Sequence, residues 1–204
     1  MIRRQGALFV VSAPSGAGKT TLCREVRRLV PDLAYSISVT TRSPRPGETS
    51  GVDFDFVTSP QFHGLLEGGE FAEWASVHGH LYGTRTRTLE AALAAGADVL
   101  LDIDTQGAAQ LRARYPEAVL AFIVAPSMAE LEQRLRERRS DAEVDIARRL
   151  ARAREEVATW RDYDYLIVNR DLKEATEHLV AIVQAERCRT ARLRLRFPDL
   201  EVKD

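Results

Sequence analysis

Short apolar runs alternate with amphipathic stretches along most of the chain, and this alternation is its clearest structural signal. Apolar runs of strand length predict buried strands at residues 7–12, 98–102, 119–124 and 165–168. Apolar residues at helical spacing predict helices at residues 19–29, 105–114, 128–138, 145–160 and 172–189. Strands that alternate with helices of this length predict an α/β fold with a doubly wound, mostly parallel sheet, which binds ligands at the carboxyl ends of its strands.

Residues 35–82 break this alternation and carry a different pattern. A Pro-rich turn at residues 43–47 and the pair Gly68 and Gly69 separate short β-like stretches from one helical stretch at residues 61–67. The β-like stretches are residues 35–40, 53–58, 71–76 and 79–82. We therefore predict a small, mostly antiparallel β lobe inserted into the α/β core.

The length of the chain limits its domain organisation. With 204 residues it is long enough for one well-buried core with inserted lobes, and short for two independent domains. We predict a single domain over residues 1–189 and a C-terminal tail over residues 190–204, and the sequence leaves open whether the tail forms an edge strand or a frayed end. The predicted parts of the domain are a core (residues 1–34, 83–125 and 161–189), the inserted lobe (35–82) and a helical lid region (126–160).

Charge and targeting features narrow the range of partners. A formal net charge of −1 argues against a nucleic-acid-binding protein, which usually carries a basic excess. The sequence opens directly into a predicted strand without a signal-peptide pattern, and no apolar run reaches membrane length. Cys23 and Cys188 lie far apart and form no metal or redox pattern. We therefore expect a cytoplasmic protein with no membrane or nucleic-acid partner, whereas the sequence does not distinguish a monomer from a homo-oligomer.

The segment around Gly16 and Gly18 joins the first predicted strand to a helix through a loop of small residues. Glycines let backbone N–H groups approach phosphate oxygens, and the positive end of the following helix points at the same anion. In such a loop Lys19 reaches the outer phosphates and the Thr20 hydroxyl ligates Mg²⁺. The alternative is an ordinary glycine-rich turn, but the strand and helix on either side favour a phosphate site. Its candidate residues are Ala13, which stands where the strict pattern has its first glycine, Pro14, Ser15, Gly16, Ala17, Gly18, Lys19, Thr20 and Thr21.

A second apolar strand ends in the acids Asp102 and Asp104. A carboxylate at the end of a strand beside a phosphate loop can hold the hydration shell of Mg²⁺. The alternative is a strand that simply reaches solvent. With the phosphate loop upstream, the sequence favours a metal role for Asp102, which would act on the ion through a water molecule.

Two predicted helices of the lid region carry clusters of arginines. The acids interleaved with them are typical of solvated, salt-bridged helix faces, and we assign most of the arginines to that role. Phosphoryl transfer, however, concentrates negative charge on the migrating group, and mobile arginines commonly stabilise it. From these clusters we select Arg134, Arg138 and Arg149 as candidates for this function and leave the rest as surface residues.

The inserted lobe contains groups suited to a second nucleotide. Arg42 and Arg45 lie three positions apart in a proline-stiffened loop, and the planar guanidinium fork matches a phosphate dianion. Glu73 offers a carboxylate, which pairs with the adjacent N1–H and N2–H₂ donors of guanine but not with the N1 acceptor of adenine. Each of these residues taken alone is more typical of surface or core.

Five motifs together resemble those of the guanylate kinase family, and they occur in the same order and at the same spacing as in that family. They are Ser-Ala-Pro-Ser-Gly-Ala-Gly-Lys-Thr (12–20), Thr-Thr-Arg-Ser-Pro-Arg-Pro-Gly-Glu (40–48), Glu-Phe-Ala-Glu-Trp-Ala (70–75), Tyr-Gly-Thr (82–84) and Leu-Asp-Ile-Asp-Thr-Gln-Gly (101–107). The resemblance covers residues 7–189 and implies a P-loop NTPase-type fold with an inserted GMP-binding lobe and a helical lid. It also implies transfer of the γ-phosphoryl group of ATP to GMP, and to dGMP, with Mg²⁺ as the cofactor, for guanine nucleotide synthesis and recycling.

The resemblance also implies a role for each matching residue. Lys19 and Thr20 match the ATP-phosphate and Mg²⁺ positions, and Asn169 falls near the adenine of ATP. Arg42, Arg45 and Tyr82 match residues that bind the GMP phosphate. Ser38, Glu73, Thr84 and Asp104 match positions around the guanine base. Asp102 matches the acid that ends the core strand. Arg134, Arg138 and Arg149 match arginines of the lid and its flanking helix.

One position departs from the family pattern. Where guanylate kinases usually have a tyrosine that reaches the GMP phosphate, this chain has Phe54. A hydroxyl bond to a charged phosphate is worth about 1.5–3 kcal/mol, so we expect weaker GMP binding without loss of activity. Two alternatives to a guanylate kinase stay open at this point: a P-loop kinase of another phosphorylated acceptor, and a non-catalytic guanylate-kinase-like binding module.

Overall fold

A five-stranded parallel sheet forms the centre of the protein. The computed structural model describes residues 2–137 and 143–195. The strand order of the central sheet is β10-β9-β2-β8-β3, and every neighbouring pair is parallel. Its strands are β2 (Leu8–Ser12), β3 (Leu33–Tyr35), β8 (Asp98–Asp102), β9 (Val119–Val124) and β10 (Tyr165–Val168).

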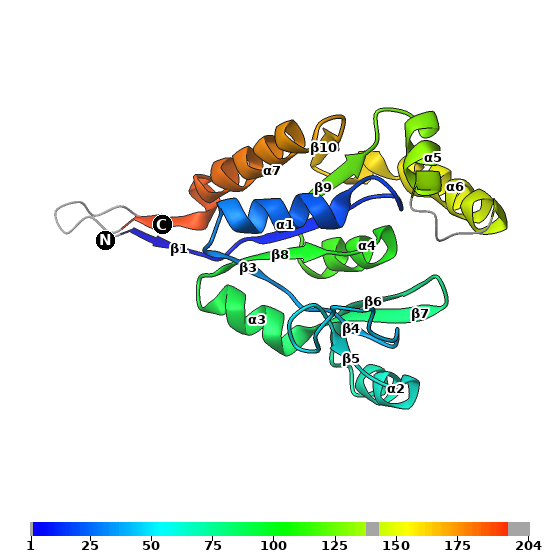
Figure 1. The fold of residues 1–204 in the computed structure, drawn as a ribbon. Coiled ribbons are helices and arrows are strands. Elements are labelled where there is room, and N and C mark those ends of the chain that lie inside the picture. Colours follow the sequence, from blue (N-terminus) through cyan, green and yellow to red (C-terminus); the bar gives the residue numbers. More distant parts are fainter. Residues whose placement is uncertain (1, 138–142, 196–204) are drawn as a thin grey trace.

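Helices cover both faces of this sheet (Figure 1). Successive side chains of a strand point to opposite faces, so Phe9 and Val11 enter one core cluster, and Leu8 and Val10 enter the other. The first cluster is completed by α1 (Lys19–Leu29) and α7 (Leu172–Arg187), and the second by α3 (Thr86–Ala94) and α4 (Thr105–Arg114). The doubly wound α/β sheet predicted from the sequence is thereby confirmed.

A smaller mixed sheet follows β3 along the chain. Its strand order is β5-β4-β7-β6, in which only the β4–β5 pair is parallel. The rings of Phe62 and Phe71 stack at 4.6 Å and, with Val39, form its small separate core. Its elements are β4 (Val39–Thr40), β5 (Asp55–Phe56), α2 (Ser59–Glu67), β6 (Phe71–Val77) and β7 (His80–Arg85).

The structure corrects the predicted elements at both ends of this smaller sheet. The sequence predicts Tyr35 in the lobe, but it ends β3 in the central sheet. The sequence predicts residues 83–85 in the core, but they continue β7. Strand β3 is too short to show the alternation of apolar and polar residues that predicts a strand. The sequence does not predict helix α3, because Arg85 at its N-cap offers no side-chain cap signal. The positions of Tyr35 and of residues 83–85 are set by strand pairing with β8 and β6.

Two helices lie beyond the carboxyl end of the central sheet, next to the loop that precedes α1 (Figure 1). They are α5 (Met128–Glu137) and α6 (Glu143–Ala158), and a short 3₁₀ turn, η1 (Trp160–Asp162), follows them. Leu135, Ile146 and Leu150 pack together with Met128 in a cluster separate from the main core. We refer to α5 and α6 as the lid helices.

The two ends of the described chain meet at the opposite side of the sheet. Strand β1 (Ile2–Arg4) pairs antiparallel with β11 (Leu193–Leu195), which follows the 3₁₀ turn η2 (Thr190–Arg192). The tail therefore begins as an edge strand, one of the two states that the sequence left open, and residues 196–204 lie outside the described residues.

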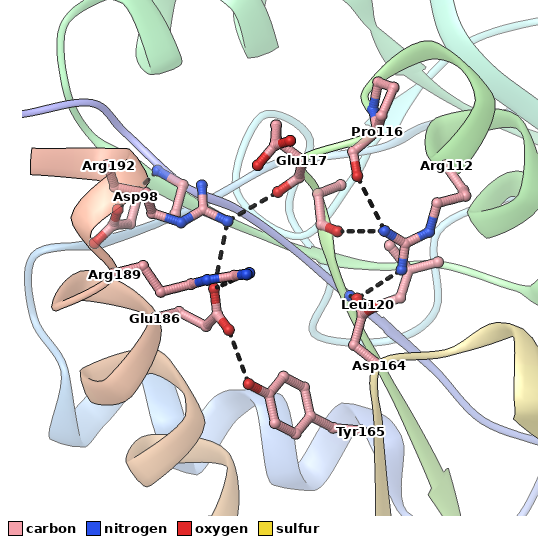
Figure 2. A network of polar contacts seen from close by, with 12 residues as sticks. Asp98, Arg112, Pro116, Glu117, Leu120, Asp164, Tyr165, Glu186, Arg189 and Arg192 are labelled. Atoms are coloured by element: carbon pink, nitrogen blue, oxygen red, sulfur yellow. Dashed lines mark hydrogen bonds and ion pairs between the residues drawn. The ribbon is translucent and has the colours of Figure 1, made fainter. Parts of the chain in front are cut away.

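A polar network fixes the entry to this terminal ribbon (Figure 2). The Glu186 carboxylate accepts the Tyr165 hydroxyl at 2.8 Å and faces the guanidinium groups of Arg189 and Arg192. Arg192 also donates to the backbone oxygen of Glu117 at 2.8 Å. These contacts join α7, β10 and the chain before β9, and so anchor β11 to the core. Among the described residues, no helix has the length and apolar character needed to cross a membrane.

Candidate active site

The loop between β2 and α1 has the backbone shape of an anion cradle. Gly16 and Gly18 have φ values of +94° and +91°, in the left-handed region that favours glycine. The N–H of Ala17 donates to the Pro14 oxygen at 3.1 Å and closes a tight turn. Helix α1 begins at Lys19, so its unpaired first N–H groups and the positive end of its dipole face the loop. Residues 13–18 form the loop itself, and Thr20 and Thr21 lie in the first turn of α1.

Lys19 links this loop to the end of strand β8. Its ammonium group forms an ion pair with Asp102 and donates to the backbone oxygen of Ile103 at 2.8 Å. Burial disfavours the charged form, but the Asp102 carboxylate more than offsets this cost, so the pKa of Lys19 is raised. The ammonium therefore stays charged at the carboxyl edge of the sheet, where the sequence predicts the phosphate and metal groups to meet.

A cavity of about 390 Å³ opens between α1, the end of β8 and the smaller sheet. Its wall combines groups from the phosphate loop with groups from the lobe. The sequence-predicted site residues that line it are Lys19, Thr20, Ser38, Phe54, Glu73, Tyr82, Asp102 and Asp104. Residues more than 80 positions apart in the chain thus share one cavity, as expected for the carboxyl edge of an α/β sheet.

Glu73 is the most deeply buried acid of this cavity, with 3% of its surface exposed. The Thr84 hydroxyl, which is fully buried, donates to Glu73 Oε1 at 2.6 Å. The other oxygen faces Gly107 so closely that a Cβ at that position would overlap it. Burial raises the pKa of Glu73 to about 7, an effect that the Thr84 hydrogen bond opposes and the Asp104 charge reinforces.

Arg42 is held by an acid of its own loop. Its guanidinium group makes a two-point ion pair with Glu48, with both N–O distances 2.9 Å, and it donates to the Ser43 oxygen at 2.8 Å. The hydrogen bond from Arg42 lowers the pKa of Glu48 and raises that of Arg42. Glu48 also accepts the backbone N–H of Arg45 at 2.7 Å, but the Arg45 residue itself is exposed, outside the set that lines the cavity.

Phe54 packs against the same guanidinium group. The Arg42 guanidinium carbon lies 5.1 Å from the centre of the Phe54 ring, and the Tyr82 ring meets Phe54 edge-on at 6.1 Å. Phe54 therefore lies beside Arg42, as the motif comparison predicts for a residue near the acceptor phosphate, and it gives Arg42 a cation–π contact in place of a hydroxyl group.

The lid helix α5 meets the phosphate loop through Asn169. Arg134 forms an ion pair with Glu130 and donates to the backbone oxygen of Asn169 at 2.9 Å. The Asn169 side chain is 6% exposed and donates to the Ala17 oxygen at 2.7 Å. Its amide nitrogen is thus directed to the loop backbone. Arg149 is half-buried on α6, and Arg138 lies outside the described residues.

Sequence reasoning missed several residues of this region. Arg152 was assigned to the surface, yet it contacts Asp104 from α6. Glu48 belongs to a quoted motif but received no role, although its spacing from Arg42 and Arg45 was a usable signal. Arg24, Arg27 and Tyr35 also line the cavity, and the Arg27 guanidinium lies 4.1 Å from the centre of the Tyr35 ring. That pairing depends on the missed strand β3.

Comparison with known sequences yields the same family as the motifs. A family model described as guanylate kinase matches residues 5–186. A guanylate kinase from Geobacter sulfurreducens is 52% identical over 192 residues, which cover 94% of this chain and 95% of the relative. Another from Syntrophotalea carbinolica is 52% identical over 206 residues, which cover 100% of this chain and 98% of the relative.

A solved structure agrees with this match. The crystal structure of guanylate kinase from Anaplasma phagocytophilum is 34% identical to this chain, with a TM-score of 0.79, and the match covers 94% of this chain and 92% of that one. Sequence and fold agree over nearly the whole length, and the chain belongs to the guanylate kinase family.

Proposed function

We propose that this protein transfers the γ-phosphoryl group of ATP to GMP, and also to dGMP, giving ADP and GDP for guanine nucleotide synthesis and recycling. The observation that carries the proposal is a single cavity lined both by the phosphate-loop Lys19 and by the buried carboxylate of Glu73. The first group suits a nucleoside triphosphate, and the second suits the donor edge of guanine. ATP and GMP as substrates agree with the cytoplasmic location expected from the sequence.

The donor half of the site consists of the loop at residues 13–18 and the start of α1. The left-handed glycines and the first N–H groups of the helix would bind the β- and γ-phosphates, and Lys19 would move from Asp102 to the outer phosphates. Asn169 donates to the loop backbone, so we assign it a role in holding the loop beside the adenine. Neutralising the phosphate charge in this way lowers the barrier to transfer.

Mg²⁺ is proposed to accompany ATP, and the chemistry of the nearby groups fits this ion. Thr20 and Asp102 both line the cavity and offer a hydroxyl and a carboxylate, the hard oxygen ligands that Mg²⁺ prefers. The described residues contain no cluster of three or more His, Cys, Asp or Glu side chains able to hold a metal ion, which suits an ion bound mainly by phosphates. We assign Thr20 as its direct ligand and Asp102 as a ligand through water; the ion would supply positive charge that neutralises the phosphates.

The acceptor half of the site lies on the smaller sheet. Glu73, oriented by Thr84, would accept the N1–H and N2–H₂ donors of guanine, with Ser38 and Asp104 around the same base. Arg42 and Tyr82 would bind the GMP phosphate. Arg45 would have to turn in from its exposed position to join them.

The reaction itself needs little from acid–base groups. The attacking atom is a GMP phosphate oxygen that is already anionic, so no residue has to remove its proton, and positioning with charge neutralisation accounts for catalysis. Arg134 and Arg149 on the lid helices would stabilise the charge of the migrating group, as would Arg138, which lies outside the described residues. Closure of the lid helices and the lobe would exclude water that otherwise hydrolyses ATP.

A screen of acceptors tests this function. We expect ADP formation from Mg²⁺-ATP to be fastest with GMP and dGMP, and far slower with AMP, UMP or ribose phosphates. A faster reaction with any non-guanine acceptor would favour a different P-loop kinase. Absence of turnover with every acceptor, together with retained ligand binding, would favour the non-catalytic module, an alternative that the family matches do not support.

A further inference from the structure

One arginine of the lid helices contacts an acid that lines the cavity. The Arg152 guanidinium, on α6, lies 3.3 Å from Asp104 Oδ2, although the two residues are 48 positions apart. The Arg152 side chain is 28% exposed and that of Asp104 is 13% exposed, so this ion pair is partly shielded from solvent. It differs from the other α6 ion pairs of Arg148 and Arg152, whose partners Asp145 and Glu156 lie on the same helix.

Arg152 is fixed at both ends of its guanidinium group. Its Nε donates to Glu156 Oε1 at 2.9 Å, one helical turn further along α6, while a terminal nitrogen contacts Asp104. The Glu156 side chain is 12% exposed, and burial is the main factor that raises its pKa. Because a guanidinium fork is rigid and planar, contacts at two of its nitrogens fix the direction of the whole group.

Asp104 in turn lies beside the second carboxylate of the cavity. Asp104 Oδ1 caps α4 by accepting the Gly107 N–H at 3.0 Å, and Oδ2 accepts the Gln106 side chain at 3.2 Å. Gly107 lies next to both acids, since its N–H binds Asp104 and a Cβ on it would overlap the Glu73 carboxylate. Two carboxylates therefore face the same part of the cavity, where their mutual repulsion would turn them apart unless cations hold them.

We propose that Arg152 is a positioning residue for guanine, which holds the Asp104 carboxylate directed at the 2-amino group of the base. Guanine presents three N–H donors, and Glu73 can accept N1–H and one hydrogen of the 2-amino group, which leaves the second hydrogen for Asp104. Arg152 thereby connects the choice of base to the lid helix α6. This inference rests on the proposed function of the site.

The test compares GMP with inosine monophosphate, which differs from GMP only in lacking the 2-amino group. The variant Arg152→Met keeps the bulk of the side chain and a strong helix former but removes the guanidinium group. We expect its kcat/KM for GMP to fall about tenfold, the scale of one charge-assisted hydrogen bond, through an increase in KM. Its kcat/KM for inosine monophosphate should stay within twofold of the wild-type value.

Two further variants make the comparison specific. Arg148→Met removes an arginine of the same helix that pairs with Asp145, and it should leave both substrates unaffected. Asp104→Asn should lose the preference for GMP as Arg152→Met does, and the double variant should lose no more than Asp104→Asn alone, because residues that act through one another are not additive. Thermal melting of each variant confirms that it is folded.

The outcomes separate this inference from the function on which it rests. Equal losses for the two substrates, or a fall in kcat with unchanged KM, would overturn the inference, because Arg152 would then act on the phosphates or on lid closure. Wild-type protein that fails to phosphorylate GMP would instead overturn the proposed function. Independent, additive losses in the double variant would also overturn the inference.

Discussion

The buried carboxylate of Glu73 should lower the free energy of unfolding when it is ionised, which is the form that we expect to bind guanine. Only 3% of the residue is exposed, and the Thr84 hydroxyl is its one strong hydrogen-bond donor among the described side chains. An ionised carboxylate costs far more free energy to bury in such a place than a neutral amide of the same shape. We therefore expect Glu73→Gln to stabilise the fold at alkaline pH while it removes the guanine acceptor.

The pKa of Glu73 sets the size of this effect. Burial raises that pKa from 4.5 to about 7, and one pKa unit corresponds to about 1.4 kcal/mol, so ionised Glu73 costs the native state about 3 kcal/mol. Because the native pKa lies above the unfolded one, the native state binds more protons. The stability contribution is complete below pH 4.5 and is lost as the pH rises through 7. The glutamine variant has no such loss.

Urea unfolding at pH 5 and pH 8.5 measures this difference directly. The free energy of unfolding of Glu73→Gln should be close to that of the wild type at pH 5, and should exceed it by about 2–3 kcal/mol at pH 8.5. Glu67→Gln, a change of an exposed acid at the end of α2, serves as the control and should show no pH-dependent difference. An equal difference between wild type and Glu73→Gln at both pH values would refute the buried, titrating carboxylate.

The same carboxylate gives the activity its own pH dependence. Guanine offers hydrogen-bond donors, so we expect the ionised form of Glu73 to bind it and kcat/KM for GMP to rise as the pH increases through about 7. The GMP phosphate also titrates near pH 6, so the informative quantity is the ratio of wild type to Glu73→Gln across the pH range. A constant ratio would show that Glu73 does not act on the base through its charge.

Three substitutions test other parts of the site. Lys19→Met should reduce turnover at least a thousandfold in a coupled ADP assay and also lower the melting temperature, because it leaves the buried Asp102 without its cation; adding Asp102→Asn should restore the melting temperature but not turnover. Phe54→Tyr should lower KM for GMP up to about tenfold with kcat little changed, and an unchanged KM would show that this ring does not reach the phosphate. Gly107→Ala should raise KM for GMP about tenfold and leave KM for ATP unchanged in initial-rate measurements, since the added Cβ overlaps Glu73; equal effects on both substrates would contradict this placement.

Strong local patterns predicted the central part of the fold. Strands β2, β8 and β9 are apolar runs buried almost throughout, and this pattern marks parallel strands without any tertiary information. The edge strand β10 is an apolar run too, although Leu166 and Val168 are exposed. The phosphate loop is equally predictable from the sequence, because its glycines, its lysine and the flanking strand and helix are contiguous in sequence. The lobe strands β4 and β5 have two residues each, and their pairing partners decide their state.

Charge partners were the least predictable feature of the site. The arginines of α6 occur among acids, and sequence spacing correctly favours local pairs such as Arg148 with Asp145. Arg152 satisfies the same spacing rule with Glu156, yet it also contacts Asp104 on another element. A local pair therefore does not exclude a long-range role, because a guanidinium group has five donors and a carboxylate on the same helix occupies only some of them.

Gly18 has two structural reasons to be a glycine, and the sequence motif indicates only one of them. The sequence motif accounts for this glycine through the backbone shape of a phosphate loop, and its φ of +91° agrees. In the fold, a Cβ at the same position would also overlap the side-chain amide of Asn169, which reaches the loop from the end of β10. Asn169 donates to Ala17 and accepts from Arg134, so the missing side chain of Gly18 makes room for the residue that joins the phosphate loop to the lid helix α5. The glycine is therefore favoured by the contact with Asn169 as well as by the backbone conformation of the loop.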